Sequence, residues 1–312
     1  MKALNKFICC AAALASAVVT GCAVTGQAAP PDLMPRRLAE IRNAIALAPS
    51  ANAGRPTIAL ALGGGGLRGF AHVGALRALE EAGIKPDIVV GTSAGSVVGA
   101  AYASGMTPGQ IKTAALEVKV SSLLDFTFSS GGIIRGNKLA DWVSSMTGQV
   151  PIEQFPIRFA AVATDLESGQ PVLIDRGAAG RAIQASSAVP GVNVPVAYNN
   201  GHLIDGGITS LVPVRFARAM GADIVIAIDI YCQSPRNNGL SMPTVLGRVM
   251  QTQSCLVAAA EMAEADILIA TTASAPGMSA RDSQERAIQA GYEAARAALK
   301  SWRPGERSAG IN

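Results

Sequence analysis

Ser93 is the side chain of this sequence best placed to act as a nucleophile. It stands in Gly91-Thr92-Ser93-Ala94-Gly95, a G-x-S-x-G sequence between the apolar stretch Ile88–Val90 and a small-residue helix expected over 96–103. A serine between a strand and a helix is typical of a nucleophile elbow, where the two glycines relieve collisions in the sharp turn. The alternative is a tight turn in which Ser93 only caps the helix.

A glycine run precedes this motif and could supply backbone amides. Gly63–Gly69, with the sequence GGGGLRG, follows the apolar stretch Thr57–Leu62 and opens a helix expected over 67–82. Its spacing also fits a dinucleotide-binding fingerprint, which needs an acidic residue after the second strand. That position holds the Ser93 turn, so a dinucleotide site is disfavoured, and no Lys-Ser or Lys-Thr pair completes a phosphate loop.

The better use of the glycines is to stabilise negative charge. Free amides at Gly64, Gly65 and Gly66 would form an oxyanion hole, in which each donor typically contributes about 3–4 kcal/mol to transition-state stabilisation. Arg68 adds a positive charge beside them. A cation on a first helical turn opposes the helix dipole, which favours a functional or loop-bracing role over an ordinary surface position.

The base that would accept the serine proton has few candidates. Only two histidines are present, His72 and His202, and His72 between apolar neighbours is typical of a packed or hydrogen-bonding residue. His202 precedes Leu203-Ile204-Asp205-Gly206-Gly207, in which Asp205 ends a short predicted strand. The two glycines allow this carboxyl group to approach a site, although an ordinary Asp-Gly turn has the same sequence.

Alternating apolar strands and helices position these groups. We expect a three-layer α/β/α domain with a mostly parallel central sheet. A helix is expected to begin at Thr107-Pro108, as N-cap and first helical residue. Further strands are expected at 158–164, 171–174, 223–229 and 266–270, and long helices at 244–263 and 283–299.

These motifs together resemble the patatin-like phospholipase family, including its bacterial and neuropathy-target-esterase branches. The glycine-rich loop, G-x-S-x-G and D-G-G occur in the family's order, and the resemblance covers about Pro56–Leu299. Gln184–Pro190 resembles a further family block, and Gly136–Leu139 does so more loosely. The family residues that match are the nucleophile Ser93, the base Asp205, the oxyanion-hole residues Gly64, Gly65, Gly66 and Arg68, and the motif glycines Gly69, Gly91, Gly95, Gly206 and Gly207.

The resemblance implies acyl transfer by a Ser-Asp dyad without histidine, metal or cofactor. The expected enzyme is a phospholipase A, lysophospholipase or carboxylesterase, whose substrate is a phospholipid or another fatty-acyl ester. Two alternatives remain open, namely an acyltransferase using the same acyl-serine and a non-catalytic lipid-binding envelope lipoprotein. Head group, chain length and protein partners are not determined by the sequence.

Composition excludes other classes of protein. The chain has 312 residues, of which 49% are hydrophobic and 15% charged, so it is not intrinsically disordered. The net charge is +4, and removal of Lys2 and Lys6 lowers it to +2. A nearly neutral chain offers no electrostatic basis for nucleic-acid binding.

The first residues are typical of a lipoprotein signal. Lys2 and Lys6 precede the apolar run Phe7–Val19, which leads to Cys22 after small residues. This pattern resembles a lipobox, in which Cys22 becomes acylated, although an ordinary signal peptide is the alternative. By the family pattern, Ala23 indicates the outer membrane of a Gram-negative envelope, with the protein facing the periplasm.

The expected organisation is a signal peptide over 1–21, a lipidated tether over 22–55, the catalytic domain over 56–302 and a tail over 303–312. One short amphipathic helix, Leu38–Leu47, is expected within the tether. The apolar segment Leu123–Phe128 is either a lid or membrane-contact element or ordinary core. Cys232 and Cys255 form either a disulfide or two buried thiols.

Overall fold

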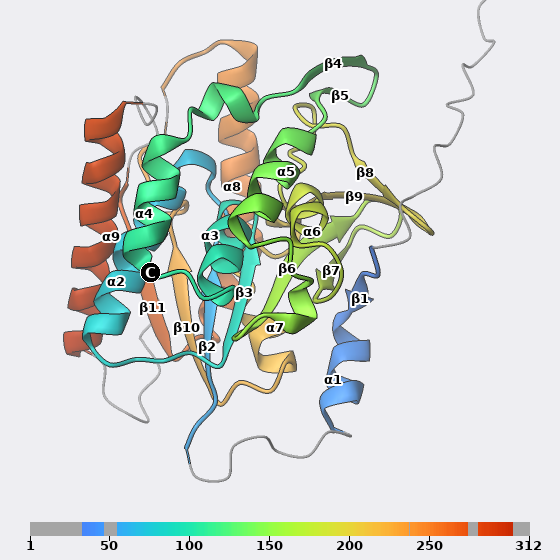
Figure 1. Cartoon of the computed structure of the whole chain (residues 1–312). Coiled ribbons are helices and arrows are strands. Elements are labelled where there is room, and N and C mark those ends of the chain that lie inside the picture. The colour runs from blue at the N-terminus through green and yellow to red at the C-terminus, as the bar shows by residue number, and fades with distance from the viewer. Residues whose placement is uncertain (1–32, 47–54, 237, 274–279, 302–312) are drawn as a thin grey trace, which may run out of the picture.

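The structure is a computed structural model that describes residues 33–46, 55–236, 238–273 and 280–301. Strands and helices alternate to build one large sheet that lies between helices (Figure 1). The strands are β1 (Arg36–Arg37), β2 (Ile58–Leu62), β3 (Ile88–Thr92), β4 (Phe126–Ser129), β5 (Gly132–Ile134), β6 (Arg158–Asp165), β7 (Gln170–Ile174), β8 (Val196–Tyr198), β9 (Gly201–Asp205), β10 (Ile224–Asp229) and β11 (Ile267–Ala270).

Parallel strands form the centre of the sheet, and antiparallel strands complete one side. The order is β1-β7-β6-β3-β2-β10-β11, in which β6, β3, β2, β10 and β11 run parallel. β7 and β9 both pair antiparallel with β6, and β9 also pairs with β8. The carboxyl ends of the five parallel strands therefore meet at the upper edge in Figure 1, where α/β proteins usually place their functional groups.

Two layers of helices cover the sheet. The helices are α1 (Leu38–Ala46), α2 (Phe70–Glu81), α3 (Ala94–Ala103), α4 (Pro108–Glu117), α5 (Asn137–Met146), α6 (Ala179–Ser186), α7 (Val214–Ala219), α8 (Met242–Met262) and α9 (Arg281–Ser301). Alternate residues of β2 point to opposite faces. Leu60 and Leu62 join the core under α2, α3, α6 and α9, whereas Ala59 and Ala61 join the core under α1, α7 and α8. The predicted three-layer α/β/α fold is therefore confirmed.

Most strands and the longer helices lie within two or three residues of their predicted positions. The predicted N-cap of α4 is also present, because the Thr107 hydroxyl accepts a hydrogen bond from the Gln110 amide at 3.3 Å. No sequence pattern predicts α5, α6, α7 or the β4–β5 hairpin. The three helices have only 10, 8 and 6 residues, so tertiary packing rather than their own periodicity stabilises them.

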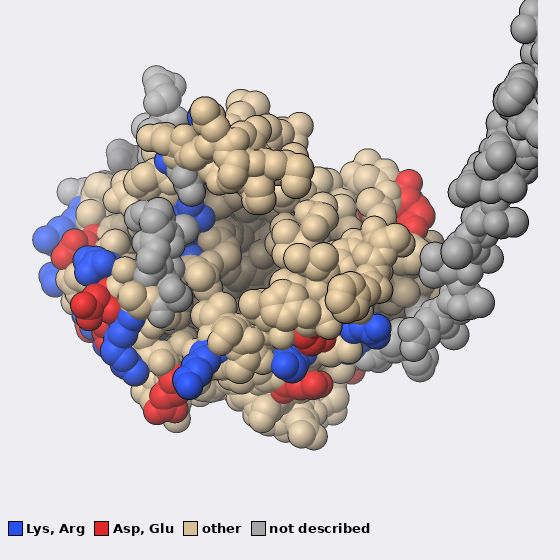
Figure 2. Space-filling view, turned by 90° about the horizontal axis from the view of Figure 1, so that it is seen from above, with Lys and Arg blue, Asp and Glu red and all other residues tan. Residues whose placement is uncertain are grey.

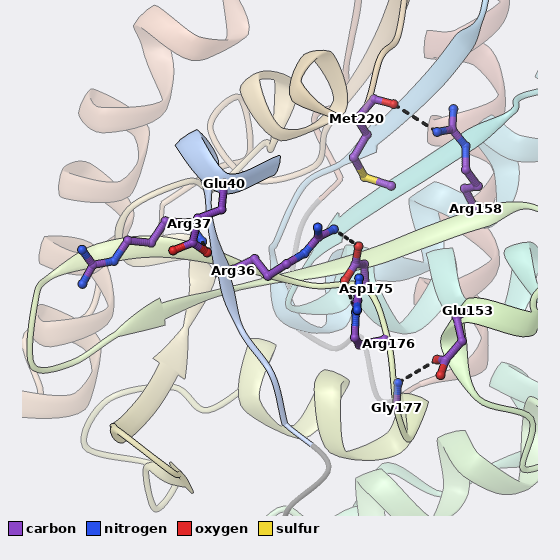
Figure 3. A network of polar contacts seen from close by, with 9 residues as sticks. All are labelled: Arg36, Arg37, Glu40, Glu153, Arg158, Asp175, Arg176, Gly177 and Met220. Carbon is purple, nitrogen blue, oxygen red and sulfur yellow. Dashed lines mark hydrogen bonds and ion pairs between the residues drawn. The ribbon is translucent and has the colours of Figure 1, made fainter. Parts of the chain in front are cut away.

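A network of charged residues at the sheet edge corrects the predicted domain boundary (Figure 3). β1 pairs antiparallel with β7, and Arg36 of β1 forms an ion pair with Asp175. Leu33 and Ile41 are fully buried. The predicted tether over 22–55 is therefore wrong for residues 33–46, because their apolar side chains and backbone complete the domain. The predicted signal peptide, Cys22 and the tail over 303–312 lie outside the described residues.

Two other open questions are answered by the fold. Cys232, which follows β10, and Cys255 of α8 form a disulfide across a Cα–Cα distance of 5.5 Å. Phe126 and Phe128 of the hairpin are exposed, so the segment Leu123–Phe128 is not ordinary core. Within the part of the chain that the structure describes, no helix is both long and apolar enough to cross a bilayer.

Close packing of α2 against α9 gives a stability test. A Cβ atom at Gly291 of α9 would collide with the Ala71 carbonyl of α2, whereas one at Gly247 of α8 would meet no atom within 4 Å. Gly291→Ala should lower the free energy of unfolding by about 1–3 kcal/mol, because the helices must separate. Gly247→Ala should raise it by about 0.5–1 kcal/mol through helix propensity. Urea unfolding measures both, and equal effects would contradict this packing.

Candidate active site

Ser93 occupies a strained corner between β3 and α3. Its backbone has φ 52° and ψ −122°, a combination that residues with a side chain rarely adopt. A Cβ atom at Gly91 would collide with the Gly95 carbonyl, and one at Gly95 with the Leu62 carbonyl. Both glycines are therefore required for the turn, as the G-x-S-x-G sequence predicts.

Asp205 reaches Ser93 because two strands share one side of β6. β3 pairs in parallel with β6 from Arg158 to Val162. On the same side of β6, β9 pairs antiparallel with the residues from Ala163 onwards. The carboxyl ends of β3 and β9 therefore meet head to head. Thr92 lies opposite Val162 and Asp205 opposite Ala163, which brings together two segments more than a hundred residues apart.

The Asp205 carboxylate is buried and hydrogen-bonded at this meeting point. It accepts a hydrogen bond from the Gly207 amide at 2.7 Å, and it shares a cavity with Ser93. Burial raises the pKa of Asp205 to about 6, although the Gly207 amide and the nearby Ser93 hydroxyl both act to lower that pKa. At neutral pH the group is mainly a carboxylate that can accept the Ser93 proton.

Ser186, which the sequence analysis left without a role, fixes the backbone of Ser93. The Ser93 amide donates to the Ser186 hydroxyl at 2.9 Å, and that hydroxyl donates to the Val162 carbonyl at 2.6 Å. Ser186 ends α6, within the block Gln184–Pro190. The block's resemblance to the family was the only signal in the sequence, because the contact spans 93 residues.

The glycine loop offers fewer free donors than predicted. The Gly64 amide donates to the Leu211 carbonyl at 3.0 Å, so Gly64 is corrected from an oxyanion donor to a residue that anchors the loop. The amides of Gly65 and Gly66 donate to no other residue in the described part of the chain. These two amides begin the 3₁₀ helix Gly66–Gly69 and lie in the same cavity as Ser93.

Arg68 braces this loop from the side. Its guanidinium lies 5.0 Å from the centre of the Tyr231 ring and donates to the Gly65 carbonyl at 3.4 Å. The Asp229 carboxylate in turn accepts the Tyr231 amide at 2.9 Å and the Cys232 amide at 3.0 Å. Arg68 thus contacts the loop and the segment after β10, and the partial burial of its guanidinium lowers its pKa.

Two cavities of different character meet at Ser93. The first, of about 310 Å³, is almost wholly apolar and is lined by residues of α2, α3, α4 and α5, among them Leu139 and Trp142. The second, of about 280 Å³, contains Asp205 and Arg68 and is bordered by Tyr231 and α8. Ser93 therefore faces a nearly apolar space on one side and, on the other, a space that is still mostly apolar but contains two charged side chains; we call them the apolar cavity and the polar cavity.

The two histidines stand apart from the Ser93–Asp205 pair. His72 is fully buried and its Nε2 donates to the Gly63 carbonyl at 2.8 Å, while burial lowers its pKa to about 4. His202 is exposed and lies 2.9 Å from Glu167. In the described residues, no group of three His, Cys, Asp or Glu side chains is arranged to hold a metal ion.

A sequence model described as patatin-like phospholipase matches residues 60–218, about half of the chain. The chain belongs to the patatin-like phospholipase family. The matched part contains the glycine loop, the Ser93 elbow and Asp205. The family resemblance of the sequence motifs is therefore confirmed.

Individual relatives agree with this family. An uncharacterized NTE family protein of Mycobacterium bovis is 40% identical over 177 residues, which cover 56% of this chain and 49% of that protein. Lysophospholipase NTE1 of Coccidioides immitis is 33% identical over 180 residues, which cover 56% of this chain and 11% of that protein. The matches thus span half or less of these relatives' length.

A solved structure shares the fold. VipD from Legionella pneumophila superimposes with a TM-score of 0.54 and 14% sequence identity, covering 80% of this chain and 67% of that chain. At this level of identity the likeness concerns the fold, and it agrees with the three-layer architecture.

The buried carboxylate gives a test of the site's electrostatics. The folded-state pKa of Asp205, about 6, lies above the ordinary value of 3.8. Ionisation of Asp205 therefore destabilises the folded state at high pH. Asp205→Asn should raise the free energy of unfolding at about pH 8 by about 3 kcal/mol, and this gain should vanish below about pH 4. Urea unfolding at both pH values measures it, and a pH-independent difference would contradict the burial of a charged carboxylate.

Proposed function

We propose that this protein hydrolyses acyl esters of membrane lipids through Ser93 and Asp205. The observation that carries the proposal is that Ser93 lies beside the buried Asp205 carboxylate in one cavity, where the Ser93 hydroxyl is near enough to lower the pKa of Asp205. Membership of the patatin-like phospholipase family supports the same class of reaction.

In the first step, Asp205 accepts the hydroxyl proton while Ser93 Oγ attacks the ester carbonyl carbon. The negative charge that develops on the carbonyl oxygen is stabilised by the amides of Gly65 and Gly66. Collapse of the tetrahedral intermediate breaks the bond to the alcohol oxygen, which takes the proton from Asp205. An acyl-Ser93 ester remains on the enzyme.

In the second step, Asp205 accepts a proton from water as the water oxygen attacks the acyl-Ser93 carbonyl. The Ser93–acyl bond then breaks, Ser93 Oγ regains the proton, and a fatty acid is released. A carboxylate is a weaker base than imidazole, and burial of Asp205 reduces this deficit by raising its pKa towards neutrality. The oxyanion donors contribute the remaining stabilisation.

The two cavities fit the two parts of a lipid ester. The apolar cavity, whose lining includes Leu139 and Trp142, suits the acyl chain. The polar cavity contains Arg68 and suits the alcohol portion of the ester, such as a glycerophosphate. Ser93 lies between them, where the ester carbonyl of a lipid bound in this way would stand.

Three substitutions test the dyad. Ser93→Ala should abolish labelling by a fluorophosphonate and reduce hydrolysis of p-nitrophenyl esters by about 10³-fold or more. Asp205→Asn should keep the fold and reduce turnover by a similar factor, because the proton acceptor is lost. His202→Gln is the matched control and should retain activity, since His202 is exposed and pairs with Glu167. A fully active Ser93→Ala or Asp205→Asn protein would reject the dyad.

Product analysis with labelled phospholipid separates hydrolysis from acyl transfer. Release of free fatty acid supports the hydrolase, and transfer of the label to an added alcohol would indicate an acyltransferase. A folded protein inactive towards every ester would instead favour a lipid-binding role.

We also propose that the protein is attached to the bacterial envelope by acylated Cys22. The Cys232–Cys255 disulfide supports a location outside the cytoplasm, where such bonds persist. Labelled palmitate should be incorporated into the protein, and Cys22→Ser should eliminate the label because the acceptor thiol is lost. Labelling that survives this substitution would contradict the anchor.

A further inference from the structure

Large apolar side chains are exposed on two separate elements of the molecule. Phe126, Phe128 and Ile133 lie on the β4–β5 hairpin, and Leu240, Met242 and Leu246 lie at the start of α8. We call these six residues the apolar rim. Exposed apolar side chains gathered on one side of a protein usually mark an interaction surface.

Both halves of the apolar rim lie on the side of the sheet that carries the active site. α8 connects β10 to the parallel strand β11, so α8 must begin at the carboxyl end of β10 and run back to the opposite edge. Figure 1 shows the hairpin at the same upper edge as one end of α8. The Ser93 and Asp205 turns lie at that edge too.

Each half of the rim is continuous with one of the two cavities. Leu123, three residues before the hairpin, lines the apolar cavity. Ile134 of β5 forms a β-bridge with Asn193, which follows the cavity residue Val189 in the chain. Met250, one helical turn after Leu246, lines the polar cavity. The rim therefore borders the cavities from two sides.

The charge pattern favours an anionic lipid surface. Seen from above, uncharged residues border most of a central hollow, and many of the visible charged side chains lie along the left and lower margins (Figure 2). Residues 119–138 contain three basic side chains and one acidic one, and residues 230–260 contain two basic side chains and no acidic one. The acidic group, Asp125, is tied to the Gly136 and Asn137 amides at 2.7 and 2.9 Å.

We propose that the apolar rim inserts into the surface of a lipid bilayer and places the mouth of the active site against it. This inference rests on the proposed function, because it assumes a substrate that resides in the bilayer. A protein partner seated on the rim would cover the cavities, whereas a bilayer covers them and also delivers the substrate. Inserted Phe and Leu side chains and flanking cations are the usual features of interfacial binding.

Flotation with vesicles of phosphatidylethanolamine and phosphatidylglycerol tests the rim. All proteins are full-length and carry Cys22→Ser, to exclude acylation, and Ser93→Ala, to keep the lipid intact. Phe126→Ser with Phe128→Ser, and separately Leu246→Glu, should each lower the vesicle partition coefficient about tenfold or more. The control Leu256→Glu should change it little, because Leu256 is 72% exposed but lies about 15 Å further along α8.

Activity assays distinguish failure of this inference from failure of the proposed function. With Ser93 restored, the rim variants should hydrolyse a soluble short-chain ester at the wild-type rate but lose about tenfold on vesicle phospholipid. Two outcomes would overturn the inference: vesicle binding unchanged in the rim variants, or a dimer of the starting protein that dissociates in those variants while vesicles are not bound. If the protein with Ser93 restored is inactive on both substrates while its Ser93→Ala counterpart binds vesicles through the rim, only the proposed function is rejected.

Discussion

The site depends on two strands that meet end to end beside β6. β3 and β9 use successive stretches of the same side of β6 and run in opposite directions, so their carboxyl ends converge. Any shift of β9 along β6 by one residue would turn the Asp205 side chain to the other face of the sheet. Glycines at both strand ends permit this approach, because a Cβ atom at Gly206 would collide with the Val162 carbonyl. Register and close packing together therefore hold the carboxylate against the hydroxyl.

The same arrangement stores unfavourable free energy in the folded state. Ser93 has a strained backbone, and Asp205 is a carboxylate removed from water, as its raised pKa shows. Neighbouring segments hold both groups in place through the Ser186 hydroxyl at the end of α6 and the Gly207 amide after β9. Under the proposed function, such a site would be prepared for proton transfer before substrate arrives, and the extensive core on both faces of the sheet offsets its unfavourable free energy.

Two cavities and an exposed apolar surface adjoin the Ser93–Asp205 site. The apolar cavity and the polar cavity meet at Ser93. The exposed apolar side chains of the β4–β5 hairpin and of α8 lie at the same edge of the sheet. The disulfide joins α8 to the segment that carries Tyr231, which in turn contacts Arg68. One helix thus contributes to the wall of the site and to the outer surface.

The sequence by itself determined the central strands, the longer helices, the elbow at Ser93 and the Asp205 turn, because glycine spacing and apolar periodicity are local properties. Tertiary structure alone decided that Gly64 donates to Leu211, that Ser186 holds the Ser93 amide, and that residues 33–46 complete the sheet edge. Each of these depends on a partner distant in sequence. A hydrogen-bond donor and its acceptor are paired by the register of strands and the packing of helices, which no local pattern encodes.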